Sequence, residues 1–139
     1  MNPKQWHTAL QAYLYGRRGE GNPLWTANVI AGVDGSTNEP FLGVVDKLGN
    51  AWEAPTVATG YGAYLAQPLL RSATQEGSVV LSEQDAVALL EQCMRVLYLR
   101  DARASDKIQL AKVSVDPQGS VQLQISKPYR VETDWSIAH

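Results

Sequence analysis

The sequence predicts an α+β domain, and three observations carry that prediction. Segments with helical and strand periodicity come in blocks, in the order one helix, three strands, two helices and two strands. Strands joined by short turns favour an antiparallel sheet with helices packed on one face. The length of 139 residues is typical of one domain, so we expect residues 1–139 to form a single domain.

The composition limits the class of protein. Twelve Lys and Arg against 14 Asp and Glu give a net charge of −2, which argues against binding nucleic acid or an anionic membrane by bulk charge. Hydrophobic residues make up 45% and charged residues 19%, as in globular domains. The single cysteine, Cys93, excludes an intramolecular disulfide and a cysteine-based zinc site. With no signal-like apolar start, we expect a soluble protein of a reducing compartment that uses no metal or cofactor.

The first predicted element is a helix over residues 3–14. Asn2 can cap this helix, and Pro3 occupies the favoured first position. We expect the helix to end near Gly16 and to be followed by a polar loop. Four apolar residues share one face at helical spacing and are expected to pack on the core: Trp6, Leu10, Tyr13 and Leu14.

Three strands are predicted next. Residues 25–33 alternate between apolar and polar side chains, and residues 34–38 have the composition of a turn. Residues 41–45 form a short apolar run that we expect to be buried on both faces, and residues 51–54 form a third short strand. Short turns between them predict a β-meander.

Two helices are predicted over residues 60–70 and 82–101. Ser82 opens the second helix in a Ser-x-x-Asp capping-box pattern. We expect Cys93 to be an inert thiol in the core. Four residues step along one face of this helix and are expected to be buried: Ala86, Leu90, Cys93 and Leu97.

The remaining chain returns to strands. Residues 110–115 and 121–125 are predicted to form a hairpin through the turn at residues 116–119. A short final helix is predicted over residues 135–139.

Two groups of residues invite a chemical interpretation. His7 and His139 lie near the chain ends outside any nucleophile motif, so we expect surface or capping histidines. Gly60-Tyr61-Gly62 opens a helix after a strand and could cradle a phosphate, but the third glycine of the dinucleotide motif and the P-loop lysine are absent. Close backbone packing at a strand-to-helix turn is the simpler interpretation of these glycines.

Two further groups point to packing or to a partner. The end of the long helix carries charged residues that predict either a structural ion-pair network or a partner-binding patch: Arg95, Arg100, Asp101 and Arg103. Large aromatic residues are frequent for so short a chain, and we expect four of them in the core or at an interface: Trp6, Trp25, Trp52 and Tyr64.

Several motifs together resemble the β subunits of the eukaryotic proteasome, and among them the non-catalytic members. The block over residues 58–70 is the most specific, and the resemblance covers nearly the whole chain. The other matching segments are residues 22–25, 41–46, 54–55, 93–98, 100–103 and 134–139.

This resemblance implies a fold and an assembly. The fold would be the four-layer αββα sandwich of the N-terminal-nucleophile hydrolases, whose β subunits form two stacked inner rings flanked by α rings. Active members use an N-terminal threonine as nucleophile and its own amine as base. This chain begins at what resembles the second helix of that fold, so the resemblance implies the C-terminal half to two-thirds of a subunit.

The resemblance also assigns three positions. Thr59 stands where active members have a serine, at a strand-to-helix turn. Asp101 matches the aspartate that helps to orient the nucleophile. The supporting serine three residues later is replaced by Ala104, and the glycines after it by Ser105 and Asp106. Thr59, Asp101 and Ala104 are therefore expected to be vestigial, with no catalytic residue.

The expected function is that of a non-catalytic, structural β subunit of the proteasome core particle, acting in ubiquitin-dependent protein degradation in the cytoplasm and nucleus. Its partners would be neighbouring β subunits, α-ring subunits and the facing β ring. Two alternatives remain open: an active threonine-type peptidase whose N-terminal half lies outside this sequence, and a stand-alone α+β domain that binds a phosphate-bearing ligand at Gly60-Tyr61-Gly62.

Overall fold

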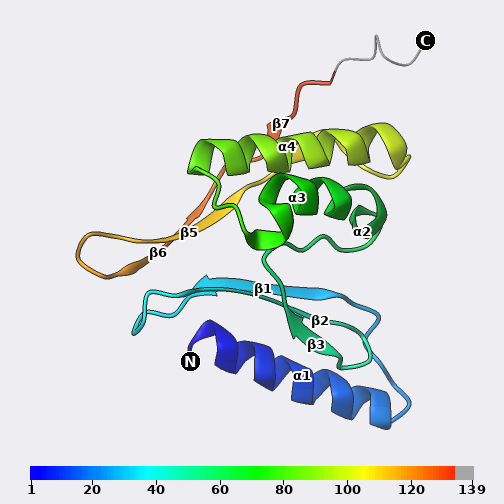
Figure 1. Cartoon of the computed structure of the whole chain (residues 1–139). Helices are drawn as coiled ribbons and strands as arrows, with labels where there is room; N and C mark the ends of the chain where they lie inside the picture. The colour runs from blue at the N-terminus through cyan, green and yellow to red at the C-terminus, as the bar shows by residue number, and fades with distance from the viewer. Residues whose placement is uncertain (134–139) are drawn as a thin grey trace. The chain divides into compact units, whose positions relative to one another are not determined.

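The computed structural model describes residues 1–133 and divides the chain into two compact units. Unit 1 comprises Met1–Val57 and Lys112–Gln124, and unit 2 comprises Ala58–Ala111 and the chain from Ile125. The helices and strands confirm the α+β class (Figure 1). No described helix combines the length and apolar character needed to cross a bilayer. The helix predicted over residues 135–139 lies outside the described residues.

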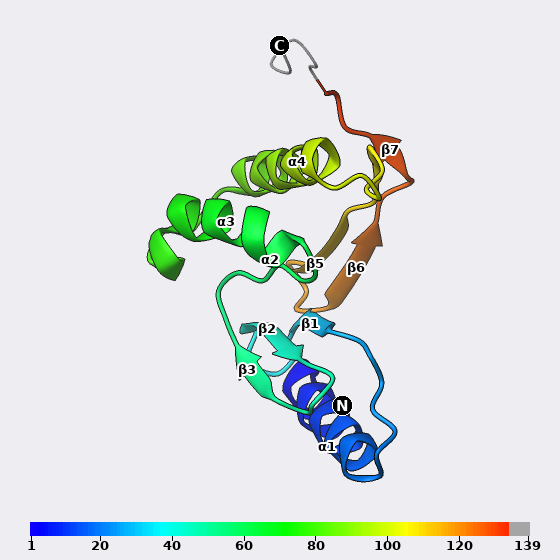
Figure 2. The ribbon, with the colours of Figure 1, turned by 90° about the vertical axis from the view of Figure 1, so that its right-hand side faces the viewer.

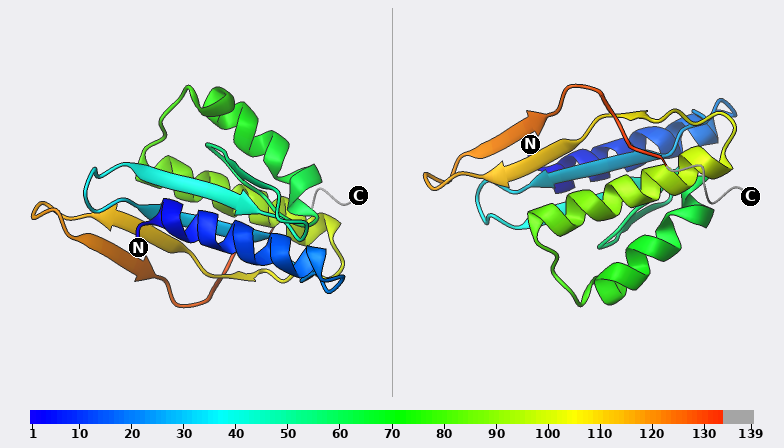
Figure 3. Two further views of the ribbon diagram at one scale, coloured as in Figure 1. Left: turned by 90° about the horizontal axis from the view of Figure 1, so that it is seen from below. Right: turned by 90° about the horizontal axis from the view of Figure 1, so that it is seen from above.

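Helix α1 (Pro3–Gly19) begins as predicted but runs further. The Asn2 side chain accepts a hydrogen bond from the Gln5 N–H, and the Gln5 side chain accepts one from the Asn2 N–H, which completes a capping box. The helix passes the expected end at Gly16 by three residues, and the Glu20 N–H donates to the Gly16 carbonyl oxygen. Figure 3 shows α1 running along the strands of unit 1.

The predicted buried face of α1 is confirmed for Leu14 and wrong for Trp6 and Tyr13. His7 and Leu14 are buried, whereas Trp6 is 57% and Tyr13 55% exposed. Close backbone approaches decide the rotation of the helix. A side-chain carbon on Gly32 would lie 2.6 Å from the Pro3 ring. A side-chain carbon on Gly43 would likewise lie 2.8 Å from the His7 ring. Only glycines allow these approaches, so the helix turns its Pro3 and His7 side toward the sheet.

The sheet of unit 1 has the strand order β1–β2–β3 and confirms the meander. Strands β1 (Asn28–Val33) and β2 (Pro40–Val45) pair antiparallel, with Asn28 opposite Val45. Strand β3 (Ala51–Glu53) pairs antiparallel with β2. The first strand is three residues shorter at its start than predicted. Residues 43–45 of β2 are buried as expected, whereas Phe41 and Leu42 are only half-buried. Helix α1 packs against this strand.

Unit 2 divides the helix predicted over residues 60–70 in two. Helix α2 (Gly62–Leu65) is followed by α3 (Gln67–Thr74) and by the short 3₁₀ helix η1 (Gln75–Gly77). The break precedes Pro68, which has no N–H to donate to the preceding turn. Helix α4 (Glu83–Arg100) matches its prediction, and the Ser82 hydroxyl caps it by accepting from the Asp85 N–H.

The core of unit 2 lies where α4 packs against α2 and α3 (Figure 2). Cys93 is buried and Leu97 packs against the core, as predicted. Ala86 is half-buried, whereas Leu90 is 42% exposed, so the prediction is wrong for Leu90. Leu89, Cys93 and Leu97 step by four residues along the packed side, and Leu90 lies one residue off that line. The buried cluster is Ala66, Leu70 and Cys93, packed against Ala58, Leu69, Leu89 and Leu97.

Two pairs of strands complete the chain. Strands β5 (Ala111–Val115) and β6 (Val121–Ile125) form the predicted hairpin, with Gly119 at a φ of 84° in its turn. Strands β4 (Lys107–Ile108) and β7 (Tyr129–Arg130) pair antiparallel and are not predicted from the sequence. Two residues are too few to show a period, so only the tertiary pairing reveals these strands.

Candidate functional site

The turn that carries Thr59 leads into α2. The Thr59 carbonyl oxygen accepts from the Gly62 N–H at 3.1 Å, and Gly60 has a φ of +60°, which glycine adopts without strain. Gly62 is buried, and a side-chain carbon there would lie 3.4 Å from the Ala58 Cβ and 3.6 Å from a methyl of Leu97. This geometry supports the close-packing interpretation for Gly62 only, because Gly60 is exposed and a side-chain carbon there would meet no atom within 4 Å. Helix α2 is a single turn and offers few aligned N–H groups to an anion.

The turn that carries Asp101 and Ala104 follows directly on α4. Asp101 is the C-cap residue, and its carboxylate oxygen accepts from the Arg103 N–H at 3.0 Å. The Arg103 Nε lies 3.7 Å from the same oxygen. The Ala104 N–H donates to the Asp101 carbonyl oxygen at 2.9 Å. The carboxylate is therefore held by its own turn.

Leu97 links the two turns at the C-terminal end of α4. Its side chain packs beside Gly62, and its carbonyl oxygen accepts from the Asp101 N–H at 2.8 Å. Figure 2 shows α2 beside this end of α4. The structure thus brings the Thr59 turn and the Asp101 turn to one place. Among the described residues, no hydrogen bond or ion pair joins Thr59 to Asp101, and Ala104 adds no polar side-chain group between them.

The arginines at the end of α4 do not form one network. The Arg95 Nε donates to the Glu132 carbonyl oxygen at 2.8 Å, while Arg103 pairs with Asp101. Arg100 is exposed. A surface pair such as Arg103 with Asp101 contributes about 0–1 kcal/mol to stability. The predicted ion-pair cluster is therefore divided among separate local contacts.

A contact that the sequence does not predict ties α4 to β7. The Tyr129 hydroxyl donates to the Glu91 carboxylate at 2.7 Å. Burial raises the pKa of Tyr129, and the hydrogen bond and negative charge of Glu91 raise it further. Burial also raises the pKa of Cys93, which agrees with an unreactive core thiol. Tyr129 and Glu91 are 38 positions apart, which explains why no local pattern signals the contact.

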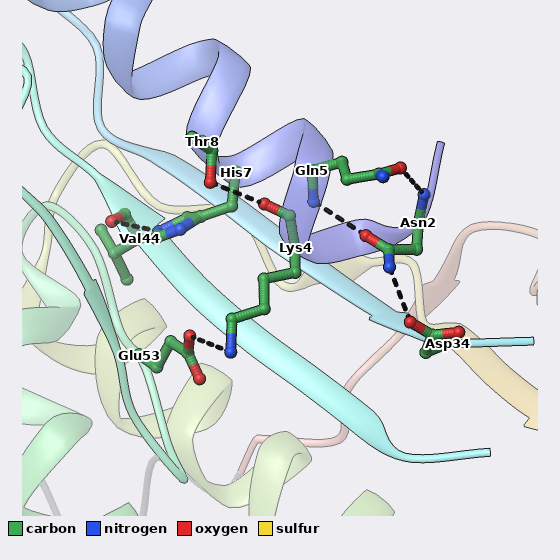
Figure 4. A network of polar contacts seen from close by, with 8 residues as sticks. All are labelled: Asn2, Lys4, Gln5, His7, Thr8, Asp34, Val44 and Glu53. Carbon is green, nitrogen blue, oxygen red and sulfur yellow. Dashed lines mark hydrogen bonds and ion pairs between the residues drawn. The ribbon is translucent and has the colours of Figure 1, made fainter. Parts of the chain in front are cut away.

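Unit 1 has a polar network of its own where α1 meets the sheet (Figure 4). The His7 Nε2 lies 3.0 Å from the Val44 carbonyl oxygen, and His7 is buried. This placement corrects the expectation of a surface or capping histidine, whereas His139 lies outside the described residues. The Asn2 amide donates to the Asp34 carboxylate at 2.7 Å. These contacts fix α1 on the sheet and offer no nucleophile.

Large aromatic side chains are exposed rather than buried. Trp25 is 78% and Tyr64 79% exposed, and Trp6 and Trp52 are also exposed. The Lys47 Nζ lies 3.7 Å from the centre of the Trp25 ring, which covers part of that indole. These four side chains are therefore not core residues of the described chain. Of the two positions expected for them, core or interface, only the interface stays a prediction.

An open apolar groove of about 760 Å³ lies in unit 1, and its rim includes aliphatic residues of both α1 and the hairpin. Trp6 and Leu10 line one side, and Val121 and Leu123 line another. Among the described residues, no cluster of three or more His, Cys, Asp or Glu could hold a metal ion. The polar groups needed to orient a small ligand are sparse along this groove.

Comparison with known proteins identifies a family. The sequence profile of the family described as "Proteasome subunit" matches residues 1–113. The chain is 46% identical over 138 residues to proteasome subunit beta type-4 of Xenopus laevis, covering 99% of this chain and 54% of that protein. It is 39% identical over 138 residues to the beta type-4 subunit of Arabidopsis thaliana, covering 99% of this chain and 52% of that protein.

A yeast relative carries a different subunit number. The probable proteasome subunit beta type-7 of Schizosaccharomyces pombe is 36% identical over 139 residues, covering 99% of this chain and 51% of that protein. The chain spans about half the length of the curated relatives it matches. The alignment includes the Thr59 turn and the Asp101 turn in each case.

Proposed function

Because the chain belongs to the proteasome subunit family, we propose that it is a non-catalytic, structural β subunit of the core particle. In this role it completes the inner ring around the chamber in which other subunits cut peptides. The particle acts in ubiquitin-dependent protein degradation in the cytoplasm and nucleus. Neighbouring β subunits, α-ring subunits and the facing β ring are the proposed partners.

The proposal includes the architecture of the whole subunit. Residues 1–139 belong to a single domain of the four-layer αββα sandwich and correspond to its C-terminal half to two-thirds. The exposed aromatic residues and the apolar groove of unit 1 support burial against further polypeptide. Trp25 and Tyr64 are too exposed to contribute to a core within the described residues alone.

The turn from Asp101 to Ala104 carries the non-catalytic assignment. An N-terminal nucleophile needs hydroxyl and carboxylate neighbours that hold its amine in place. Here Ala104 presents a methyl group at the position of the supporting serine, and the Asp101 carboxylate is engaged by the Arg103 N–H. Thr59 keeps a hydroxyl, but that hydroxyl has no polar partner among the described residues. We therefore regard all three positions as vestigial.

Covalent labelling tests this function. Particles that contain the subunit are treated with a threonine-directed electrophile such as an epoxyketone, and each subunit is analysed by mass spectrometry. We expect adducts on other β subunits and none on this one. An Ala104→Ser variant restores the missing hydroxyl and is expected to remain unlabelled. Stoichiometric labelling of a threonine in this subunit would establish the alternative, an active threonine-type peptidase.

A further inference from the structure

The turn between β1 and β2 contains a chemically distinctive dipeptide. Of the seven aspartates in the sequence, only Asp34 is followed by glycine, and no asparagine is followed by glycine. A glycine after aspartate leaves its backbone nitrogen unhindered, so that nitrogen can attack the aspartate side chain. We propose that Asp34 is a site of spontaneous isoaspartate formation, and that Asn2 and Ser36 set its rate.

The reaction uses only water besides the chain itself. The Gly35 nitrogen forms a bond to the Asp34 Cγ of the protonated carboxyl group, the Cγ–OH bond breaks, and the amide proton leaves with that hydroxyl as water. A five-membered succinimide results. Water then opens either carbonyl: cleavage at Cγ restores aspartate, and cleavage at the main-chain carbonyl carbon gives isoaspartate. No oxidant, reductant or change in final mass is involved.

The structure leaves the attacking nitrogen available. Gly35 is exposed, and its N–H donates no hydrogen bond to any described residue. The neighbouring backbone groups of the turn are paired: the Asp34 N–H donates to the Glu39 carbonyl oxygen, and the Asn38 N–H donates to the Asp34 carbonyl oxygen. The turn therefore holds its shape without using the Gly35 nitrogen.

The Asp34 carboxylate, in contrast, is held by three donors. Its Oδ1 accepts from the Ser36 hydroxyl at 2.6 Å and from the Ser36 N–H at 2.9 Å. Its Oδ2 accepts from the Asn2 amide at 2.7 Å (Figure 4). The Ser36 hydrogen bonds are the main cause of the lowered pKa of Asp34, and the Asn2 bond adds to it. Because the ionised carboxylate is a poor electrophile, these donors slow the attack.

Isomerisation would change how α1 is attached to the sheet. The isoaspartyl linkage inserts the side-chain carbons of Asp34 into the main chain, and the carboxylate moves to the α-carbon. The Oδ2 that accepts from Asn2 then no longer occupies its place. Asn2 caps α1, so the modification acts at the first turn of that helix.

The rate of isoaspartate formation in aged protein tests the proposal. The purified chain is incubated at neutral pH and physiological temperature and digested with trypsin. The peptide over residues 19–47 contains Asp34, and protein isoaspartyl methyltransferase with labelled S-adenosylmethionine quantifies the product. We expect Asn2→Ser and Ser36→Ala each to accelerate formation by about twofold or more, because each variant removes a donor that favours the ionised carboxylate. Serine at position 2 keeps a capping oxygen and loses the amide donor.

Two variants in the same turn serve as controls. Gly35→Ala is expected to slow formation several-fold, because a Cβ hinders the attacking nitrogen. The added Cβ would lie at an ordinary 3.6 Å from Val121, so the fold is preserved. Thr37→Ala leaves the Asp34 carboxylate untouched and is expected to retain the wild-type rate. The proposal is overturned if Asn2→Ser and Ser36→Ala both age at the wild-type rate. It is equally overturned if the isolated peptide over residues 19–47 forms no isoaspartate, or forms it no faster than the folded chain.

Discussion

The imidazole of His7 donates from its Nε2 to the carbonyl oxygen of Val44 across 3.0 Å, because a carbonyl oxygen can only accept. The two residues are 37 positions apart, and the bond joins the buried side of α1 to the centre of the sheet. The His7 ring also meets the Phe41 ring edge to face at 5.3 Å.

Replacing His7 should show how much this hydrogen bond contributes to the free energy of unfolding. In a His7→Leu variant the apolar packing volume is largely kept, but the Val44 carbonyl oxygen loses the imidazole donor and keeps only its pairing with β3. Loss of such a hydrogen bond costs about 0.5–1.5 kcal/mol of the free energy of unfolding. Urea titration in dilute solution measures the loss. A Gln11→Leu variant on the exposed side of α1 is the matched control. Equal effects of the two substitutions would contradict the prediction.

The corrected face of α4 makes a prediction about neighbouring leucines. Leu89 packs against the core cluster of unit 2, whereas Leu90 is largely directed away from it. Leu89→Ala should lower the free energy of unfolding by about 2 kcal/mol or more, because it leaves a cavity. Leu90→Ala should lower it by less than about 1 kcal/mol. The urea midpoints of the two variants show which leucine lies on the packed side of the helix. A larger loss of unfolding free energy for Leu90→Ala than for Leu89→Ala would contradict this prediction.

The lowered pKa of Asp34 predicts a dependence of stability on pH. The pKa of Asp34 in the folded chain lies below its ordinary value of 3.8, chiefly because Ser36 donates to the carboxylate. The contribution of the ionised group is therefore fully present above 3.8 and is lost as pH falls through the lower, folded value. Asp34→Ala should reduce the urea midpoint at neutral pH, and the difference from wild type should shrink in acid. A difference that stays constant would count against this carboxylate as the cause.

Asp101 provides a test that separates structure from catalysis. In Asp101→Asn the side-chain oxygen can still accept from the Arg103 N–H, so stability should fall by no more than about 1 kcal/mol. Asp101→Ala removes that acceptor and should affect assembly or stability more. Peptide hydrolysis per assembled particle should be unchanged in both variants. Loss of hydrolysis at a normal yield of particles would assign Asp101 a catalytic part.

The exposed apolar surface of unit 1 predicts self-association of the isolated chain. Trp6 and Leu123 line the open groove, and both are exposed. Apolar patches of this kind are association sites. Sedimentation velocity should show species larger than a monomer that grow with concentration. Trp6→Gln with Leu123→Gln should reduce them, whereas Val80→Gln, at an exposed position in unit 2, should not. A sharp monomeric boundary for the wild-type chain at all concentrations would contradict this.

Much of the local structure follows from the sequence by itself. Asn2 with Pro3 starts α1, Ser82 starts α4, and the turn with Gly119 closes the hairpin, because capping and turn chemistry act within a few residues. Alternating strands joined by short turns likewise fix the meander, since the partners of each strand are its neighbours in the chain. The motifs that resemble the family lie in these same local segments.

Tertiary structure alone decided the final rotation of the two helices and which distant residues meet. Periodicity correctly placed Leu14, Cys93 and Leu97 on the packed sides. Because both helices carry more apolar residues than one face can bury, the same periodicity wrongly included Trp6, Tyr13 and Leu90. The rotation of α1 follows from the glycines of the sheet, which leave room for Pro3 and His7. The rotation of α4 follows from the packing of Leu89, Cys93 and Leu97 in the core of unit 2. The contact of Tyr129 with Glu91 and the pairing of β4 with β7 join distant segments. Such contacts depend on chain geometry over tens of residues, which no local spacing encodes.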